Sequence, residues 1–366
     1  MNILISGIGG PTPQSIARSL KMGKFGSNVK LFGTDSNPLS YGLYDSDLYE
    51  ETRVIPYAEG EGYWDAIEEM VEKHDITYAM VHPEKEVIAW AKRQTEGKPM
   101  PCKVMIPNLS LVNNLVDKAK MSELLKGTNF IPSTLTLDPL KLNFEEILKT
   151  LTPPFWIRSS TGSCGLGSLK IHNNSELHNW ISINPNVESF IASSYLPGRN
   201  LACKLLYFNG ELIRSATGER VNYIMSNVAP SGITGNTSFG RLINDRNIVD
   251  ISVAALTLLS EKSNSIKHGI FTVDLKEDEN GTPFLTEINV RMVAFNDCFA
   301  KAGANFSDDI LQLMSDGEID RSFINYTFKE GTIFLRNVDS TPILLNENEL
   351  KLNIKSQNNC ILNSPI

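Results

Sequence analysis

Apolar residues in the first third of the chain follow two alternating patterns. Short β-branched and apolar runs predict strands at Asn2–Ser6, Val29–Gly33, Tyr78–Val81 and Lys103–Ile106. The stretches between the runs carry apolar residues at helical spacing and predict helices at Thr12–Met22, Tyr63–His74 and Glu84–Gln94. Strands that alternate with helices are typical of a doubly wound parallel sheet, so an α/β domain is expected here. In such sheets, ligands bind at the loops that follow the strands.

The pattern changes after this region. One long helix is predicted over Ser110–Lys126, with Gly127 as its C-terminal cap. From about Phe155 onward strands predominate, which indicates an α+β arrangement with antiparallel sheet. The predicted turns are Asn173–Asn174 and Asn209–Gly210, the predicted helices are Asn247–Glu261 and Asp308–Met314, and a short tail carries strand candidates at Gly331–Arg336 and Ile343–Leu345.

The segment Phe271–Met292 reads FTVDLKEDENGTPFLTEINVRM and predicts a β-hairpin with its turn at Asp278–Gly281. Side chains alternate between the two faces of a strand. Glu287, Asn289 and Arg291 therefore share one face of the second strand, and the residues between them are apolar.

Pairing around this turn would bring Asp274 beside Glu287. Two carboxylates and the amide oxygen of Asn289 form an oxygen-only set suited to Mg²⁺. The guanidinium of Arg291 can hold a phosphate or an oxyanion, because it stays charged. A solvated strand face is the alternative that composition alone allows.

Composition limits the class of protein. The 366 residues suggest two or three domains, and the 41% hydrophobic and 21% charged content is that of a soluble globular protein. The net charge of −8 disfavours a nucleic-acid partner or a basic membrane-surface protein, and no apolar run is long enough to span a bilayer. The five scattered cysteines and the absence of a basic leader predict a reducing, cytoplasmic location.

A glycine- and serine-rich loop follows the apolar strand Phe155–Ile157. Such a loop can fold over a polyphosphate and offer its backbone N–H groups as donors. Its candidate phosphate-binding residues are Arg158, Ser159, Ser160, Gly162, Ser163 and Gly165. It lacks the Gly-Lys-Ser/Thr of a Walker loop, and an ordinary hairpin loop is the alternative.

The sequence Gly7–Gly10 follows the first predicted strand and precedes a helix, which is the position of a dinucleotide-binding turn. Asp35, after the second strand, could then hold a ribose. Thr12 stands where that motif has its third glycine, which disfavours NAD. The other interpretations are a tight strand-to-helix turn and a substrate-facing loop that meets an anion.

Three further side chains are candidates for contact with a substrate. His82 and Glu86 bracket the end of a predicted strand, where functional residues of α/β sheets gather. Arg220 follows a predicted strand pair.

In this order and at this spacing, these segments resemble the ATP-grasp superfamily from about residue 2 to about residue 317. The resemblance is greatest to its carbamoyl-phosphate-synthase-like and amino-acid-ligase branches. It rests on Phe32–Pro38 in the N-terminal part, Asp117-Lys118, Arg158 with the loop after it, Tyr195–Arg199, and the set Asp274, Glu287, Asn289 and Arg291.

The resemblance implies a role for each candidate residue. It assigns metal binding (Mg²⁺ or Mn²⁺) to Asp274, Glu287 and Asn289, ATP binding to Lys118, Arg158, Ser194, Tyr195, Leu196, Asn200 and the glycine-rich loop, and catalysis to Arg158 and Arg291. Ser194 and Asn200 depart from the family, which commonly has acidic residues at these places.

The resemblance also implies an organisation and a function. Residues 1–112 would form a pre-ATP-grasp α/β domain, 113–192 and 193–317 the two subdomains of an α+β ATP-grasp domain, and 318–366 a short tail. The expected activity is that of an ATP-dependent carboxylate–amine ligase, which forms an acyl phosphate from small-molecule substrates. The oligomeric state stays open, although homodimers are common in the families that the chain resembles. A small-molecule kinase and a nucleotide-binding module without catalysis are the alternatives.

Overall fold

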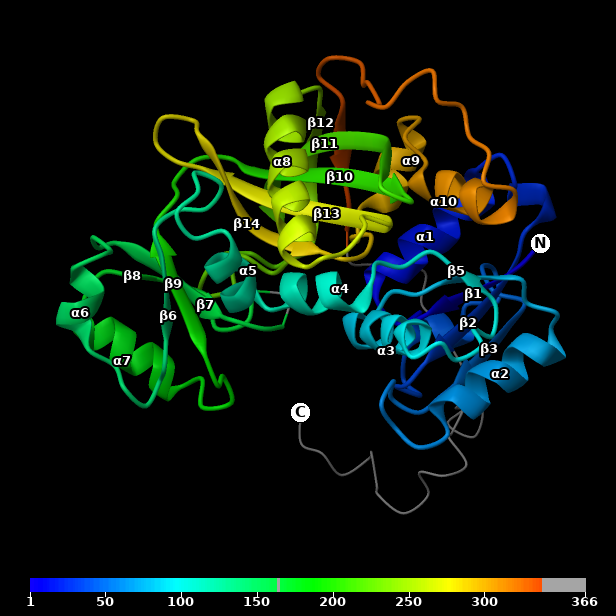
Figure 1. Cartoon of the computed structure of the whole chain (residues 1–366), viewed down its shortest axis with the longest axis horizontal. Helices are drawn as coiled ribbons and strands as arrows, with labels where there is room; N and C mark the ends of the chain where they lie inside the picture. The colour runs from blue at the N-terminus through cyan, green and yellow to red at the C-terminus, as the bar shows by residue number, and fades with distance from the viewer. Residues whose placement is uncertain (163–164, 338–366) are drawn as a thin grey trace.

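The computed structural model describes residues 1–162 and 165–337, which form three sheets (Figure 1). A parallel sheet and a four-stranded antiparallel sheet lie at opposite ends of the molecule, and a six-stranded sheet lies between them (Figure 1). None of the described helices is long and apolar enough to cross a bilayer. The predicted strand at Ile343–Leu345 falls outside the described residues.

The parallel sheet has the strand order β3-β2-β1-β4-β5. Its strands are β1 (Asn2–Ser6), β2 (Lys30–Asp35), β3 (Glu51–Val54), β4 (Tyr78–Met80) and β5 (Lys103–Val104). Its helices are α1 (Pro11–Met22), α2 (Tyr63–Lys73) and α3 (Glu84–Thr95), with 3₁₀ turns at Gly26–Asn28 and Tyr41–Tyr44. The predicted alternation of strands and helices is confirmed, and β3 is a strand that the pattern did not predict.

Alternate residues of β1 are buried against opposite faces of this sheet. Ile5 lies in one apolar cluster with Ile16 of α1, whereas Leu4 lies in a second cluster with Trp90 of α3. Helices therefore cover both faces, as the doubly wound prediction requires. The loops after β1 and β4 emerge at the carboxyl edge of the sheet.

The four-stranded sheet has the order β6-β9-β7-β8 and an apolar core of its own. Its elements are β6 (Thr134–Leu137), α6 (Phe144–Leu148), β7 (Phe155–Ser159), β8 (Leu169–Ile171), α7 (Asn174–Ser182) and β9 (Phe190–Ser194). The predicted turn at Asn173–Asn174 is wrong. The Asn173 side chain accepts the Glu176 N–H and caps α7, because asparagine favours helix N-termini as well as turns.

The central sheet is antiparallel, with the order β14-β13-β10-β11-β12-β15. Its strands are β10 (Asn200–Phe208), β11 (Glu211–Tyr223), β12 (Thr237–Ile243), β13 (Gly269–Glu277), β14 (Pro283–Asn289) and β15 (Ile333–Leu335). Its helices are α8 (Arg246–Lys262), α9 (Asn296–Lys301) and α10 (Phe306–Ser315). The predicted hairpin turn at Asn209–Gly210 is confirmed, and both residues have the positive φ that a tight hairpin needs.

The single helix predicted over Ser110–Lys126 is wrong, because the structure has two helices there. They are α4 (Leu109–Val116) and α5 (Lys118–Leu124), and Asp117 between them has an extended backbone. The Asp117 carboxylate accepts the N–H groups of Ala119 and Lys120, which caps α5. This break places Lys118 at the first position of a new helix.

One lysine lies inside the core between the central sheet and its helices. Lys204 of β10 is fully buried, and its Nζ donates to Asn296 Oδ1 at 2.9 Å. The rings of Phe295, Phe299 and Phe306 surround the ammonium at 4.7–5.6 Å from their centroids. Burial lowers the pKa of Lys204 to about 7, because the charged form is poorly solvated there.

We predict that Lys204→Met removes a pH dependence of stability. The unfolded lysine keeps its proton up to about pH 10.4, so between about pH 7 and 10 the unfolded state binds more protons than the folded state. The free energy of unfolding of the unsubstituted protein should therefore rise with pH over this range, and that of the variant should rise less. Urea unfolding at several pH values measures both slopes, and equal slopes would contradict a depressed pKa.

Candidate active site

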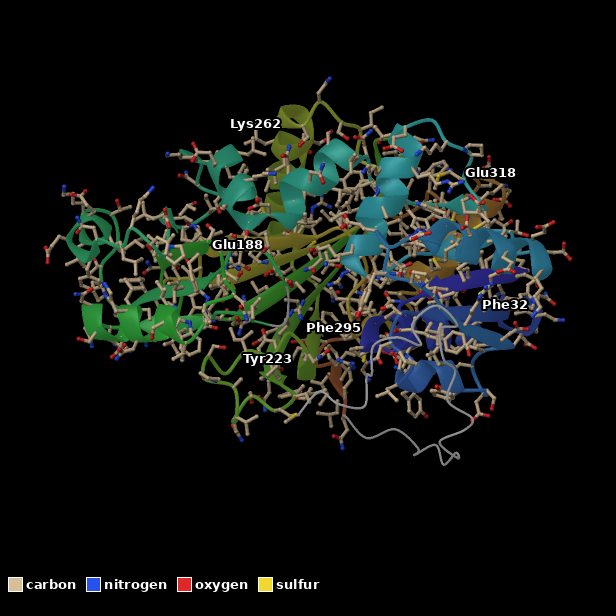
Figure 2. All side chains as sticks on the ribbon, turned by 90° about the horizontal axis from the view of Figure 1, so that it is seen from below. Phe32, Glu188, Tyr223, Lys262, Phe295 and Glu318 are labelled. Carbon is tan, nitrogen blue, oxygen red and sulfur yellow. The ribbon has the colours of Figure 1, made fainter. Side chains whose placement is uncertain are left out.

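A cleft of about 920 Å³ opens where the three sheets meet. Its lining includes the turn after β1, the loop after β4, the glycine-rich loop after β7 and the β13–β14 hairpin. Figure 2 shows Phe295 between Glu188, beside the four-stranded sheet, and Phe32 of the parallel sheet, with Tyr223 lower in the view. Tyr223 is one of the lining residues.

The β13–β14 hairpin brings the predicted metal ligands together. Asp274 pairs directly with Glu287 across the two strands. Asn289 Nδ2 lies 3.1 Å from Asp274 Oδ2 and 3.3 Å from Glu287 Oε1. All three side chains line the cleft, while Ile288 on the other face is buried. The predicted hairpin and the predicted neighbours are confirmed, but metal binding stays a prediction.

Each carboxylate of this pair has a cationic partner from another element. Arg220 of β11 lies 2.6 Å from Asp274 Oδ1, and Lys118 Nζ lies 3.4 Å from Glu287 Oε2. Burial raises the pKa of Asp274, and Arg220 only partly offsets this. Burial also acts to raise the pKa of Glu287, but the charges of Lys118 and Arg158 outweigh it and lower that pKa.

Lys118 and Arg158 connect the hairpin to the glycine-rich loop. The Lys118 backbone N–H donates to Ser160 O at 2.9 Å, and its Nζ donates to Gly162 O at 2.8 Å. Arg158 Nη2 donates to Thr286 O of β14 at 2.5 Å, and its buried Nε has no hydrogen-bond partner among the described residues. Both side chains line the cleft beside the carboxylates.

The glycine-rich loop lies against a second segment of the cleft wall, residues 224–236. A Cβ added to Gly165 would lie 2.5 Å from Ile233 O, and its φ of +73° also favours glycine. Ser159, Gly162 and Gly165 line the cleft. Ser160 does not: it is buried and its N–H donates to Ser189 O, because it continues the pairing of β7 with β9. Ser163 falls outside the described residues.

The residues predicted to meet the nucleoside lie together at one end of the cleft. Ser194, Tyr195, Leu196 and Asn200 all line it. A residue that sequence reasoning missed, Lys276, also lies there, and its Nζ donates to Asn200 Oδ1 at 3.0 Å. Asn200 and Lys276 are directly paired on β10 and β13, a register that the sequence does not reveal.

The other end of the cleft is formed by the parallel sheet and Arg291. His82 lines it, and so does Glu84, which sequence reasoning missed. Glu86 is placed elsewhere: it is buried against α2, and Tyr63 Oη donates to its Oε2 at 2.5 Å. The structure therefore corrects Glu86 as a pocket candidate. On α3, the first residue faces the cleft, whereas Glu86 two positions later turns into the core.

The Gly7–Gly10 turn also reaches the cleft through Gly7 and Gly10. The Gly9 N–H donates to Asp35 Oδ2 at 2.7 Å, so this carboxylate closes the turn rather than standing open to a ribose. A Cβ on Gly7 would lie 2.3 Å from Pro83 Cγ, which ties the turn to the loop after β4. These contacts disfavour a dinucleotide site and fit a tight strand-to-helix turn whose glycines reach the cleft.

The charge of the cleft differs from that of the whole chain. Of the described side chains that line it, the cationic ones are Lys118, Arg158, Arg220, Lys276 and Arg291, and the anionic ones are Glu84, Asp274 and Glu287. This excess of two positive charges lies in a chain of net charge −8. In the described part of the chain no group of three or more His, Cys, Asp or Glu side chains could hold a metal ion. The oxygen ligands that the hairpin could give a metal ion are two carboxylates and one amide.

No family model matches the chain, and no curated protein matches its sequence. Solved structures with similar folds include an L-amino acid ligase from Bacillus licheniformis, with a TM-score of 0.60 and 16% identity over 86% of this chain and 73% of that one. A second is the biotin carboxylase domain of 2-oxoglutarate carboxylase from Hydrogenobacter thermophilus, solved with MgADP, ADP and bicarbonate. Its TM-score is 0.63 and its identity 13%, over 88% of this chain and 71% of that one. A third is N5-carboxyaminoimidazole synthetase from Staphylococcus aureus, solved with ADP, with a TM-score of 0.60 and 17% identity over 91% of this chain and 79% of that one. The chain has the ATP-grasp fold that these proteins share.

We predict that Asp274→Asn destabilises the fold through Arg220. The substitution keeps the shape of the side chain but leaves a buried guanidinium without its ion-pair partner, which costs about 3 kcal/mol in comparable cases. The double variant Asp274→Asn with Arg220→Met should recover part of this loss, because it removes the unpaired charge. Urea unfolding measures the unsubstituted protein, both single variants and the double variant, and additive effects in the double variant would contradict the coupling.

Proposed function

We propose that this protein is an ATP-dependent carboxylate–amine ligase. The main support is the β13–β14 hairpin, whose two carboxylates and one amide line the same cleft as Lys118, Arg158 and Arg291. The fold supports the proposal, since structures with this fold include an amino-acid ligase and complexes with ADP and MgADP. The positive excess of the cleft suits a polyphosphate.

The hairpin fits Mg²⁺ by its donor set. Asp274 and Glu287 are hard carboxylate ligands in direct register, and a rotation of the Asn289 amide would present its oxygen to the same point. Burial raises the pKa of Asp274 despite the charge of Arg220, so a further positive charge beside this carboxylate would stabilise its ionised form. When bound, the ion would neutralise charge on the β- and γ-phosphates of ATP.

The cationic side chains around the hairpin would then act on phosphate and acyl oxygens. Lys118 and Arg158 would hold the γ-phosphate, whose phosphorus is attacked by the substrate carboxylate while its bond to ADP breaks. An amine would next attack the acyl carbon, forming the C–N bond while the C–O bond to phosphate breaks. Arg291 would stabilise the oxyanion of that step.

The segments that close the cleft would protect the acyl phosphate. The glycine-rich loop lies against residues 224–236 at Gly165 and Ile233 and is tied to Lys118 through Gly162. Water that entered would hydrolyse the intermediate, so a closed wall has a direct chemical use. Ser194, Tyr195, Leu196 and Asn200 would take the nucleoside at the other end.

The direct test is a Mg²⁺-dependent ATP turnover screen with pools of amino acids and small carboxylic acids, singly and in pairs. ADP release that requires both an acid and an amine supports the ligase. ADP release with one substrate and a stable phosphorylated product would instead identify a kinase. AMP as product would overturn the acyl-phosphate route, and ATP binding without turnover would favour a binding module.

We predict that Glu287→Gln lowers kcat by at least about 100-fold, because it removes a charged ligand of the proposed metal site and the partner of Lys118. The matched control is Glu279→Gln, at an exposed position in the turn of the same hairpin. The control should keep its turnover. Circular dichroism and urea unfolding would show that both variants fold, and near-normal turnover of folded Glu287→Gln would remove the metal assignment.

A further inference from the structure

Two side chains after β4 line the cleft, and neither has a hydrogen-bond partner in the part of the chain that the structure describes. Glu84, at the first position of α3, lines the cleft and makes no hydrogen bond or ion pair with another described residue. Its carboxylate lies in the field of Arg291 and Lys118, and it shares a small side cavity with Glu287. It is therefore close to the proposed site of phosphoryl transfer, at the part of the cleft that the parallel-sheet region contributes.

His82 lies two residues earlier and lines the same cleft. It is 5% exposed, and neither ring nitrogen makes a hydrogen bond of good geometry with a described residue. Burial lowers the pKa of His82 to about 3, so the ring is neutral. A neutral imidazole has one donor and one acceptor nitrogen. A buried polar ring without a partner is costly unless a ligand completes it.

An anionic carboxylate and a neutral acceptor nitrogen on one short loop are complementary to an ammonium group. Glu84 would repel a phosphate or a carboxylate, and the cations of the cleft already suit such groups. We propose that Glu84 and His82 bind the protonated amine of the amine substrate and hold it beside the acyl carbon. The ammonium would pass one proton to the Glu84 carboxylate before its nitrogen attacks, because an ammonium has no lone pair. This inference rests on the proposed ligase function, and it identifies the second substrate of the ligase as a positively charged amine.

The test compares a cationic nucleophile with an uncharged one. Hydroxylamine is largely neutral near pH 7 and traps an acyl phosphate as a hydroxamate, so it does not need an ammonium site. For an acid–amine pair found in the turnover screen, Glu84→Gln should raise the KM for the amine about 10- to 100-fold, since it loses one charge-assisted contact. The same variant should keep its KM for ATP and its hydroxamate yield with hydroxylamine.

The controls separate this inference from the proposed function. Glu72→Gln, an exposed position on α2, should behave as the unsubstituted protein with both nucleophiles. His82→Gln, which keeps an uncharged acceptor, should raise the KM for the amine less than His82→Leu does. An unchanged KM in Glu84→Gln, or an equal loss with amine and hydroxylamine, would overturn the ammonium site. No hydroxamate from the unsubstituted protein would overturn the ligase itself.

Discussion

The arrangement of this molecule depends on two adjacent carboxylates whose negative charges are balanced by cationic side chains from distant parts of the sequence. Asp274 and Glu287 face each other on β13 and β14, where like charges would repel if nothing balanced them. Their partners come from β11 and α5, and Arg158 of β7 adds its charge to Glu287. The charge balance therefore requires the central sheet, α5 and the four-stranded sheet to be assembled together. A site built in this way exists only in the complete fold.

The apolar cores enforce that assembly. One cluster joins the parallel sheet, α4, α5 and the α8 side of the central sheet, and another joins α1 to the opposite side. Polar contacts extend the second cluster: Asn296 bonds Ser19 of α1, Ser307 of α10 and Lys204 of β10. The four-stranded sheet has a separate core, and the cleft contacts of Arg158 with Thr286 and of Lys118 with Ser160 and Gly162 help to link it to the rest. Binding at the cleft and placement of this sheet are therefore physically coupled.

Local patterns predicted those parts of the site that local geometry decides. The Asp274–Glu287 pairing follows from strand alternation and one turn, so the hairpin could be derived from the sequence. Glu84 and Glu86 show the limit: two positions on a helix differ by about half a turn, and only the packing of α3 against α2 decides which one faces the cleft. Arg220 lies 54 residues from Asp274 in the sequence, and its side chain reaches Asp274 across β10, the strand between theirs. No local sequence pattern predicts this contact.

Asn200 stands where the resemblance to ATP-grasp proteins implies an acidic residue, and this difference has a physical consequence. An acidic residue at position 200 would pair with Lys276 across β10 and β13, and the two charges would cancel. Asn200 instead accepts one hydrogen bond from Lys276 and leaves its charge uncompensated. The positive excess of the cleft thus extends from the carboxylate hairpin to its far end, in a chain whose net charge is −8. Under the proposed function, this field would draw a polyanion to the cleft although the net charge of the chain is negative, and the carboxylates would take the metal ion that accompanies it.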